Sequence, residues 1–548
     1  MDVMELKRFE TLSPFEIKDE LIKLAKKTSR TTQSAFLNAG RGNPNWIATT
    51  PREGYFLLGQ FAITESKRVM EHPAGLGGMP QAKGIAARLQ AWLTKHADMP
   101  GASFLADMVP FAVKTFGFEP DAFVHELVDS IIGDNYPVPD RMLIHNERIT
   151  HEYLMWAMCG DPKPAGKFDL YAVEGGTAAM CYIFKSLKAN RLLHPGDTIA
   201  LGTPIFTPYI EMTHLEDYAL NVVNIAAPQE NRFQFTDAEI KKLEDPKIKA
   251  FFVVNPGNPT GMALSKETIG KIANLVKTKR PDLMLLTDDV YGTFVPEFRS
   301  LLGELPHHTI GVYSYSKYFG ATGWRLGVIA VHEDNIYDKM LAKLPNADLK
   351  ALDKRYGALT LEPRKVKFID RIVADSRDVA LNHTAGLSLP QQVMMSLFSL
   401  VELMDSEKRY QTACKEIVYR RIHDLLEGLG LEVPPNPRYD AYYALIDFEF
   451  WASKNIGKEA VEYLKKNVHP LDLAFRLAED HGIVLLNGGG FDAPDWSLRV
   501  SLANLNDEAY EEIGRGVRSI ARGYRHAYEA QKHAHEVKGG KKPAPAGR

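Results

Sequence analysis

Between residues 168 and 330, short apolar runs alternate with stretches of helical pattern, and this alternation constrains the fold more than any other feature of the chain. Each run is long enough for one strand, and the stretches between them are long enough for covering helices. Strands connected in this way lie mostly parallel and are buried on both faces, so they read as continuous apolar runs. We therefore predict an α/β fold with a mostly parallel sheet covered by helices. The runs are DLYAV, TIALG, LNVVNI, KAFFVVN, LMLLTDD, TIGVYSYS and LGVIAV.

At 548 residues the chain is longer than one hydrophobic core usually holds, so two domains that share an interface are expected. A small α+β domain is expected near the C-terminus, with strands in YYALIDFEF, GIVLLN and SLRVSL. The predicted organisation is an N-terminal segment that joins the small domain (1–50), a helical insertion (51–135), a large domain (136–385, of which 331–385 is a second helical insertion), a C-terminal small domain (386–535) and a disordered tail (536–548).

Charge and cysteine content argue against several classes of protein. The net charge of −3 offers no basic excess for nucleic acid or an acidic membrane surface. Cys159, Cys181 and Cys414 are far apart and form no CxxC pair, so neither a disulfide framework nor a metal site is predicted. The charged N-terminus lacks the apolar core of a signal peptide, and no apolar stretch approaches the length of a membrane span. We expect a cytoplasmic protein.

The segment SYSKYFGATGWRLG follows a strand-like run and places an arginine eight residues after a lysine. A lysine that forms a Schiff base must reach an aldehyde carbon from a fixed backbone position, and a phosphate dianion needs hydroxyl donors and a guanidinium group. Lys317 suits the aldehyde, whereas Ser314 and Arg325 suit the phosphate. A surface lysine in a glycine-rich loop is the alternative interpretation. The combination favours a pyridoxal phosphate (PLP) site.

NPGNPTG, which runs from Asn255 to Gly261, directly follows the buried run KAFFVV. A strand followed by an Asn/Pro/Gly turn is a common ligand position in open α/β sheets. An asparagine amide at this point can donate to a phenolate oxygen or to a substrate carboxylate. One NP dipeptide would indicate a plain turn, but the doubled motif after a buried strand favours a functional role.

Two further strand ends carry weaker signals. In LLTDDVYGTF, Asp288 can hold a pyridinium nitrogen protonated and Tyr291 can donate to a phenolate oxygen, although a helix N-cap explains the aspartate equally well. In VEGGTAAM, Gly175, Gly176 and Thr177 can offer backbone N–H groups to an anion at a helix N-terminus. A helix start without any ligand is the more frequent case for such a segment.

In their order along the chain, these segments resemble the fold-type I PLP enzymes of the aspartate aminotransferase family. The resemblance covers roughly residues 35–45 and 130–510. It implies a PLP cofactor, a large domain with a seven-stranded sheet, and a small domain built from the N- and C-terminal segments. By position, Lys317 would carry PLP and shuttle protons, Asp288 would pair with the pyridine nitrogen, and Phe206 would stack on the ring. The full set of cofactor-binding residues implied is Gly176, Thr177, Phe206, Asn258, Asp288, Tyr291, Ser314, Lys317 and Arg325.

The same resemblance implies a set of substrate-binding residues. Arg499, in SLRVSLANL, matches the arginine that clamps the substrate α-carboxylate, although alone it would read as a strand-edge arginine in an ion pair. Gly42 and Asn258 are expected to help hold that carboxylate. Tyr136 matches a tyrosine that reaches the phosphate of the neighbouring subunit, which implies at least a homodimer.

A narrower resemblance is to the bifunctional aspartate aminotransferase and L-aspartate β-decarboxylase group. It rests on Arg41, on the helical segments at about 50–135 and 331–385, and on the motifs GRGNPNW and DNYPVPDRM. This resemblance implies conversion of L-aspartate to L-alanine and CO₂, with transamination to a keto acid as the secondary reaction. Lys317 would be the central catalytic residue, and Arg41 and Tyr136 would hold the departing β-carboxylate loosely. It also favours a homo-oligomer larger than a dimer, with no nucleic-acid or membrane partner.

Two alternatives remain open at this point. An ordinary aminotransferase would need the same cofactor residues throughout. A PLP-binding regulator fused to a DNA-binding domain belongs to another class, but the region before Gly42 is too short for a winged helix and a linker. The product formed from aspartate distinguishes the first alternative from a decarboxylase.

Overall fold

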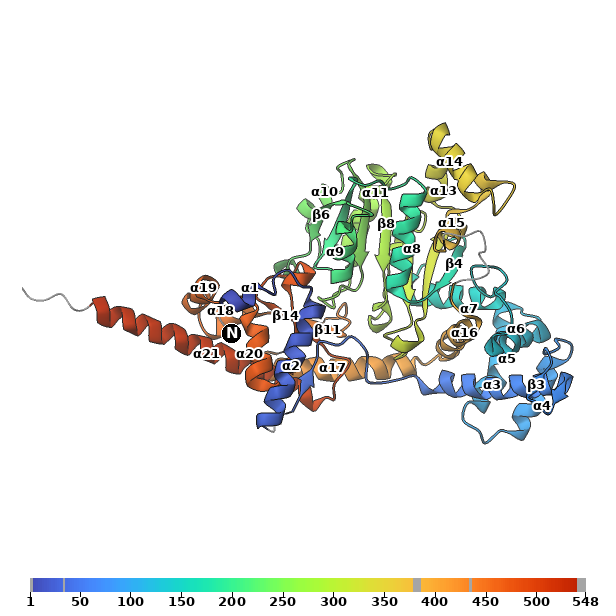
Figure 1. Ribbon diagram of the computed structural model, residues 1–548, viewed down its shortest axis with the longest axis horizontal. Helices are drawn as coiled ribbons and strands as arrows, with labels where there is room; N and C mark the ends of the chain where they lie inside the picture. The colour runs from blue at the N-terminus through green and yellow to red at the C-terminus, as the bar shows by residue number, and fades with distance from the viewer. Residues whose placement is uncertain (1–2, 33–34, 378–385, 433–435, 540–548) are drawn as a thin grey trace, which may run out of the picture.

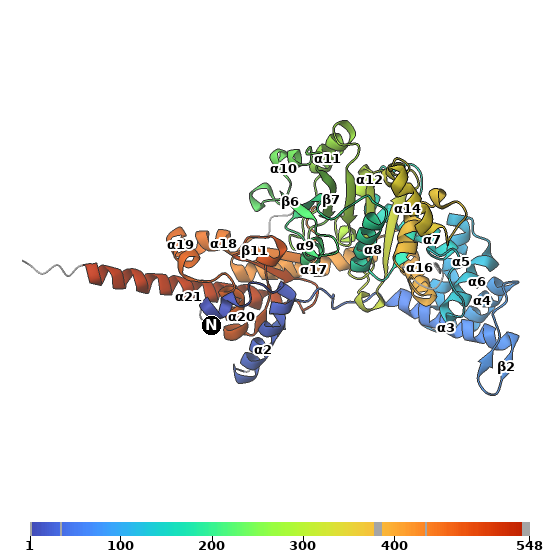
Figure 2. The same cartoon turned by 45° about the horizontal axis from the view of Figure 1, so that its top comes forward.

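The computed structural model describes residues 3–32, 35–377, 386–432 and 436–539. A body of sheet and helices occupies the middle of the molecule (Figure 1). A mostly helical region, from α3 (Thr49–Val69) to α6 (Pro120–Ile132), lies at one end, and the first and last helices of the chain lie together at the other end. Figure 2 shows the same arrangement from a second direction, with the long helix α21 extending away from the body.

Each of the seven predicted apolar runs forms one strand of a seven-stranded sheet. The order across the sheet is β4-β10-β9-β8-β7-β5-β6, and all neighbouring pairs are parallel except those made by β10. The α/β fold class predicted from the sequence is confirmed. The strands are β4 (Phe168–Val173), β5 (Thr198–Thr203), β6 (Asn221–Ala226), β7 (Ile248–Val254), β8 (Met284–Asp288), β9 (Thr309–Ser314) and β10 (Gly327–His332).

Both faces of this sheet are buried, which explains why its strands are continuously apolar. In β7, Phe252 and Val254 join a core on the side of α8 (Gly176–Ala189), whereas Phe251 and Val253 join a core with α11 (Lys266–Thr278). Successive side chains of a strand point to opposite faces, so a strand between two helical layers must be apolar at every position.

The two segments predicted as helical insertions are largely helical. The first contains α3 (Thr49–Val69), α4 (Ile85–Lys95), α5 (Ala102–Phe116) and α6 (Pro120–Ile132), which share a hydrophobic core with α16 (Leu389–Met404). It also contains a two-stranded hairpin, β2 (Glu71–His72) and β3 (Leu76–Gly77), which the sequence pattern did not predict. The second contains α13 (Ile336–Leu341), α14 (Asn346–Tyr356) and α15 (Phe368–Asp375).

The small α+β part combines the two ends of the chain. Near the N-terminus, α2 (Pro14–Thr32) packs against α20 (Asp472–His481), and β1 (Leu37–Asn38) pairs with β12 (Ile483–Val484). The C-terminal helices α17 (Arg409–Leu429) and α21 (Glu508–Gly539) pack along each other. A three-stranded sheet lies beside them, in the order β11 (Tyr443–Asp447), β14 (Ser497–Ser501) and β13 (Leu486–Asn487).

Two sequence-based boundaries need correction. The strand predicted over YYALIDFEF ends at Asp447, because the Asp447 carboxylate accepts a hydrogen bond from the Phe450 N–H at 2.9 Å and caps α18 (Phe448–Asn455). The tail predicted to be disordered from residue 536 begins as helix, since α21 continues to Gly539. The remaining part of that prediction, residues 540–548, lies outside the described residues. In the described part of the chain, no helix combines the length and the apolar character needed to cross a membrane.

Candidate active site

A cavity of about 330 Å³ lies where the carboxyl ends of three neighbouring sheet strands face β11 and β14. Val254, Asp288 and Ser314 end β7, β8 and β9, and all three contribute to its wall. Parallel strands bring their carboxyl ends to one edge of a sheet, which is the usual ligand position in open α/β folds. Eleven predicted cofactor- or substrate-binding residues line this one cavity: Gly42, Gly176, Thr177, Phe206, Asn258, Asp288, Tyr291, Ser314, Lys317, Arg325 and Arg499.

Lys317 lies three residues after the end of β9, in the turn that leads to Arg325. Its ammonium group donates a hydrogen bond to the backbone oxygen of Gly42 at 3.1 Å. The Tyr442 hydroxyl donates to the same oxygen at 2.8 Å. The lysine is therefore held by one weak backbone acceptor and by no carboxylate among the described residues. Such a lysine is free to react with an aldehyde.

Asp288 is buried at the end of β8, with 6% exposure, and lines the cavity. Burial raises the pKa of its carboxyl group, and hydrogen bonds from the Tyr209 hydroxyl and the Val290 N–H act in the opposite direction. The two donor–acceptor distances are 2.6 Å and 3.2 Å. A buried carboxylate held by two donors suits a cationic ring nitrogen, because an opposite charge favours its ionised form.

An anion site lies at the start of α8. Gly175 is its N-cap with φ of 96°, a left-handed conformation that favours glycine. A Cβ at that position would collide with Nη2 of Arg325. The Arg325 guanidinium is tethered by hydrogen bonds to the backbone oxygens of Glu174 and Thr322, each 3.1 Å long. Helix N–H groups, the Ser314 hydroxyl and a guanidinium together form the donor set that a phosphate requires.

Arg499 is the largest charged side chain buried in the site, with 1% exposure. It donates to Asn258 Oδ1 at 3.2 Å and to the backbone oxygen of Gly40 at 3.1 Å, but its buried Nε has no hydrogen-bond partner. None of the described carboxylates forms an ion pair with it. Burial lowers the pKa of this guanidinium. A buried cation with an unused donor is costly unless an anion binds, so the position fits a substrate carboxylate.

The residues that line the cavity fit PLP. The cavity offers an amine at Lys317, an anion site at Arg325 and the start of α8, and a buried carboxylate at Asp288. The Phe206 ring lines the wall and contacts the Tyr209 ring edge-on at 5.3 Å between centroids.

Besides the apolar Val254 and Val290, six lining residues were not among the predicted site residues. Tyr209 and Tyr443 matter most, because one contacts Asp288 and the other lies against Arg499, with 4.3 Å between the guanidinium carbon and the ring centroid. Tyr209 follows Phe206 by three residues in TPIFTPY, and this spacing could have indicated it. The remaining four are Phe15, Asn43, Ser316 and Thr322.

The structure does not bring Arg41 or Tyr136 into the cavity of the single chain. Arg41 is exposed beside Gly42, and Tyr136 is 64% exposed in the segment after α6. The expected role of Tyr136 involves a second copy of the chain, and the roles of both residues stay predictions.

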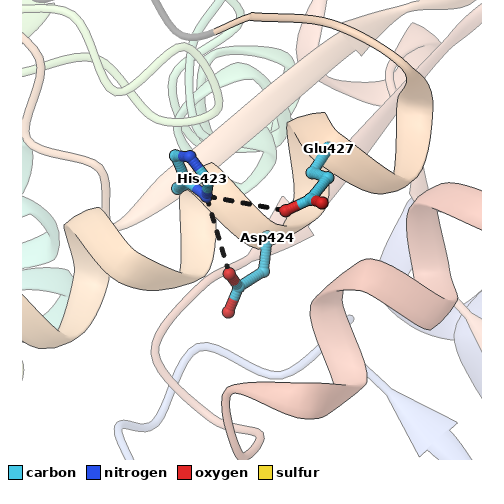
Figure 3. A group of neighbouring side chains, drawn as sticks. All are labelled: His423, Asp424 and Glu427. Atoms are coloured by element: carbon cyan, nitrogen blue, oxygen red, sulfur yellow. Dashed lines mark ion pairs between the residues drawn. The ribbon is translucent and has the colours of Figure 1, made fainter.

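One group of potential metal ligands occurs among the described residues, on the surface of α17 (Figure 3). His423 Nδ1 lies 3.7 Å from Asp424 Oδ1 and 3.9 Å from Glu427 Oε2. These are ordinary ion-pair contacts of neighbouring helix positions, and the side chains of His423 and Glu427 are largely exposed. The group therefore does not indicate a metal site.

Comparison with known proteins gives the family context of this cavity. Residues 175–516 match the family described as aminotransferase class I and II. A Pseudomonas sp. protein named bifunctional aspartate aminotransferase and L-aspartate beta-decarboxylase is 48% identical over 511 residues, which cover 93% of this chain and 96% of that protein. An aspartate aminotransferase from Pyrococcus abyssi is 33% identical over 175 residues, which cover 31% of this chain and 44% of that enzyme.

Solved structures support the fold. The aspartate aminotransferase of Thermus thermophilus with maleate superposes with a TM-score of 0.56 at 18% identity, covering 95% of this chain and 99% of that one. A double mutant of the same enzyme gives the same TM-score and covers 92% and 96% of the two chains.

Proposed function

This chain belongs to the family of class I and II aminotransferases, and from that premise we propose that it is a PLP-dependent L-aspartate β-decarboxylase with a secondary aspartate aminotransferase activity. The relative that covers nearly the whole chain carries both activities in its name. The observation that carries the proposal is that Lys317, Asp288 and Arg499 converge on one cavity. They offer it an amine, a buried carboxylate and a buried guanidinium with an unused donor.

When bound, PLP supplies an aldehyde that condenses with amines and a ring that accepts electrons from bonds to the neighbouring carbons. Nζ of Lys317 holds that aldehyde and later moves a proton at the substrate α-carbon. Arg325, Ser314 and the first N–H groups of α8 anchor the phosphate. Asp288 holds the proton on the ring nitrogen, which strengthens the electron demand of the ring.

Arg499 orients the substrate by binding its α-carboxylate, with Asn258 and Gly42 beside it. The lining residues of the single chain include three cationic side chains, those of Lys317, Arg325 and Arg499, and each already has a role. Within the described wall, the side-chain carboxylate of aspartate therefore meets no further cation. A loosely held carboxylate loses CO₂ more easily, because a tight ion pair would stabilise the bound carboxylate before the bond breaks.

The proposal is tested with purified protein, L-aspartate and PLP by following CO₂, alanine and keto acid together. We expect CO₂ and alanine in equal amounts, with less keto acid. Keto acid formation without CO₂ would overturn the decarboxylase proposal and leave an ordinary aminotransferase.

Replacing Tyr209 with phenylalanine is expected to shift the pH dependence of activity. The hydroxyl at present opposes the effect of burial on the Asp288 carboxyl, so its removal raises the pKa of Asp288 further. Asp288 is ionised only above its pKa, so the acidic limb of the kcat/KM profile moves to higher pH. A hydrogen bond to a charged group contributes about 1.5–3 kcal/mol, which corresponds to about one to two pH units.

The matched control is Tyr182→Phe, since Tyr182 donates to the carboxylate of Glu174 at 3.1 Å and does not line the cavity. Its pH profile should coincide with that of the unmodified enzyme. Coincidence of the Tyr209→Phe profile with both would contradict the role given to Tyr209.

We further propose a cytoplasmic homo-oligomer of at least two subunits. Tyr136 is exposed, and apolar side chains are exposed on α3 and the adjoining hairpin, among them Phe56, Ile63 and Leu76. Exposed apolar groups of this kind are typical of subunit interfaces. Native mass spectrometry measures the number of subunits, and a monomer at micromolar concentration would contradict this proposal.

A further inference from the structure

Tyr443 faces the cavity, and the proposed mechanism assigns it no role. It is the first residue of β11, and its side chain is 2% exposed. In the pairing of β11 with β14, Tyr443 lies opposite Ser501 and Leu445 lies opposite Arg499. Alternate residues of a strand share a face, so the side chains of Tyr443 and Arg499 project to the same side. The guanidinium carbon lies 4.3 Å from the centre of the Tyr443 ring.

The Tyr443 hydroxyl and the Lys317 ammonium face one small volume above Gly42. A Cβ built on Gly42 would lie 2.6 Å from the Tyr443 oxygen and 3.2 Å from Lys317 Nζ. Glycine at this position therefore leaves space that both polar atoms can reach. A bound amino acid with its carboxylate on Arg499 and its nitrogen near Lys317 must place its α- and β-carbons close to this space.

The charges around Tyr443 favour the loss of its proton in the free protein. Burial raises the pKa of the phenol, but Lys317, Arg499 and a hydrogen bond with Tyr291 act against burial, and the net effect lowers the pKa below its usual value. An ionised Asp440 carboxylate would raise the pKa of Tyr443. Burial raises the pKa of Asp440 itself well above its usual range, which favours the neutral carboxyl, so Asp440 opposes the lowering of the Tyr443 pKa only weakly.

The two neighbouring phenols hold their protons more tightly. The pKa values of Tyr291 and Tyr442 are raised well above the usual value by burial and by the proximity of Tyr443. Of these three neighbouring phenols, Tyr443 is therefore the one that loses its proton first.

We infer that Tyr443 is a second catalytic residue, whose oxygen takes up a proton from solvent when a dicarboxylate enters the cavity and later gives that proton to the β-carbon. Binding of a carboxylate to Arg499 neutralises the cation that lies 4.3 Å from the centre of the Tyr443 ring, and this drives the uptake. The second half of this inference rests on the proposed decarboxylation.

The proton balance of the reaction agrees with this role. Conversion of the aspartate anion to zwitterionic alanine and CO₂ consumes one proton. The bond between Cβ and the side-chain carboxyl breaks, CO₂ leaves without the electron pair, and the pair forms a new C–H bond with the Tyr443 proton. The O–H bond breaks in the same step and restores the phenolate for the next cycle. No oxidant or reductant is required.

The first test measures protons instead of turnover. Succinate, a dicarboxylate without an ammonium group, is titrated into the PLP-loaded enzyme by calorimetry in buffers of different ionisation enthalpy. The pH is set where the PLP-loaded enzyme shows more tyrosinate absorbance than the PLP-loaded Tyr443→Phe variant. Uptake of about one proton per site is expected, since one phenol binds one proton. It should disappear in Tyr443→Phe and persist in the control Tyr337→Phe, which removes a buried phenol remote from the cavity.

The second test separates chemistry from positioning. Tyr443→Phe is expected to lower the formation of CO₂ and alanine by about 10²-fold or more, the usual contribution of a positioned acid. Transamination should fall much less, because it never protonates the β-carbon. Unchanged proton uptake in Tyr443→Phe, or an equal loss of both reactions, would overturn the inference. Failure of the proposed decarboxylation can be told apart from failure of the inference about Tyr443. In the first case the unmodified enzyme would release no CO₂ while proton uptake on succinate binding remained.

Discussion

Replacing Lys317 with alanine is expected to reduce the formation of alanine and CO₂ by about 10⁴-fold or more, at or beyond the upper limit for a positioned acid or base. The loss has two causes, since Lys317 supplies both the amine that holds the cofactor and the base that moves the α-proton. Among the described residues that line the cavity, Lys317 is the one lysine, so no neighbouring lysine stands ready to replace it.

The measurement combines steady-state rates with the visible absorbance of the cofactor. Lys317→Arg should fail as completely as Lys317→Ala, because a guanidinium keeps the charge but does not condense with an aldehyde under these conditions. Lys271→Ala serves as the matched control, since Lys271 is an exposed lysine in ion pairs with Asp237 and Glu267. Retention of more than about a tenth of the activity by Lys317→Ala would be inconsistent with the role of Lys317 as acid and base.

Replacing Arg499 with methionine is expected to have the second-largest effect, a loss of about 10²–10⁴-fold in kcat/KM for aspartate. Removing one partner of a buried, hydrogen-bonded charge pair costs about 3–5 kcal/mol, and each 1.4 kcal/mol is tenfold. The stability of the free protein should change little or even rise. In the free protein the guanidinium is buried, and among the described residues it has no carboxylate partner and its Nε has no hydrogen bond.

Arg421 provides the matched control for this prediction. It is also buried, but its Nε pairs with Asp507 at 2.7 Å and its other nitrogens bind Leu502 and Asn45. Arg421→Met should therefore destabilise the fold by about 3 kcal/mol while leaving the KM of the folded enzyme nearly unchanged. Chemical denaturation and substrate kinetics on both variants measure the contrast. Equal destabilisation by the two substitutions would show that Arg499 is structural.

Much of the sheet and its ligand edge could be predicted from the sequence for a physical reason. Strands buried on both faces are continuously apolar, so the seven runs were visible without knowledge of tertiary contacts. The polar residues that interrupt or follow these runs, such as Asp288 and Ser314, mark the carboxyl ends of the strands. The structure places these ends at one edge, where they line the cavity with Lys317.

Tyr443 could not be recognised in the same way. It stands beside Tyr442 in a strand pattern where both read as core residues, and which of the two faces the cavity depends on the pairing of β11 with β14. The end of that strand at Asp447 was also missed, because a helix cap depends on the conformation of the next residues. The role predicted for Tyr136 involves a second subunit, which a single sequence does not place.

The most direct measurement of the central claim uses L-aspartate that carries an isotopic carbon label in its side-chain carboxyl group. The purified enzyme with PLP is given this substrate, and the label is followed in the gas phase and in the amino and keto acids. If the enzyme is an aspartate β-decarboxylase, most of the label released from aspartate appears as CO₂ and none is found in alanine. Label retained in a dicarboxylic keto acid, with unlabelled gas, would contradict the claim and identify transamination as the main reaction.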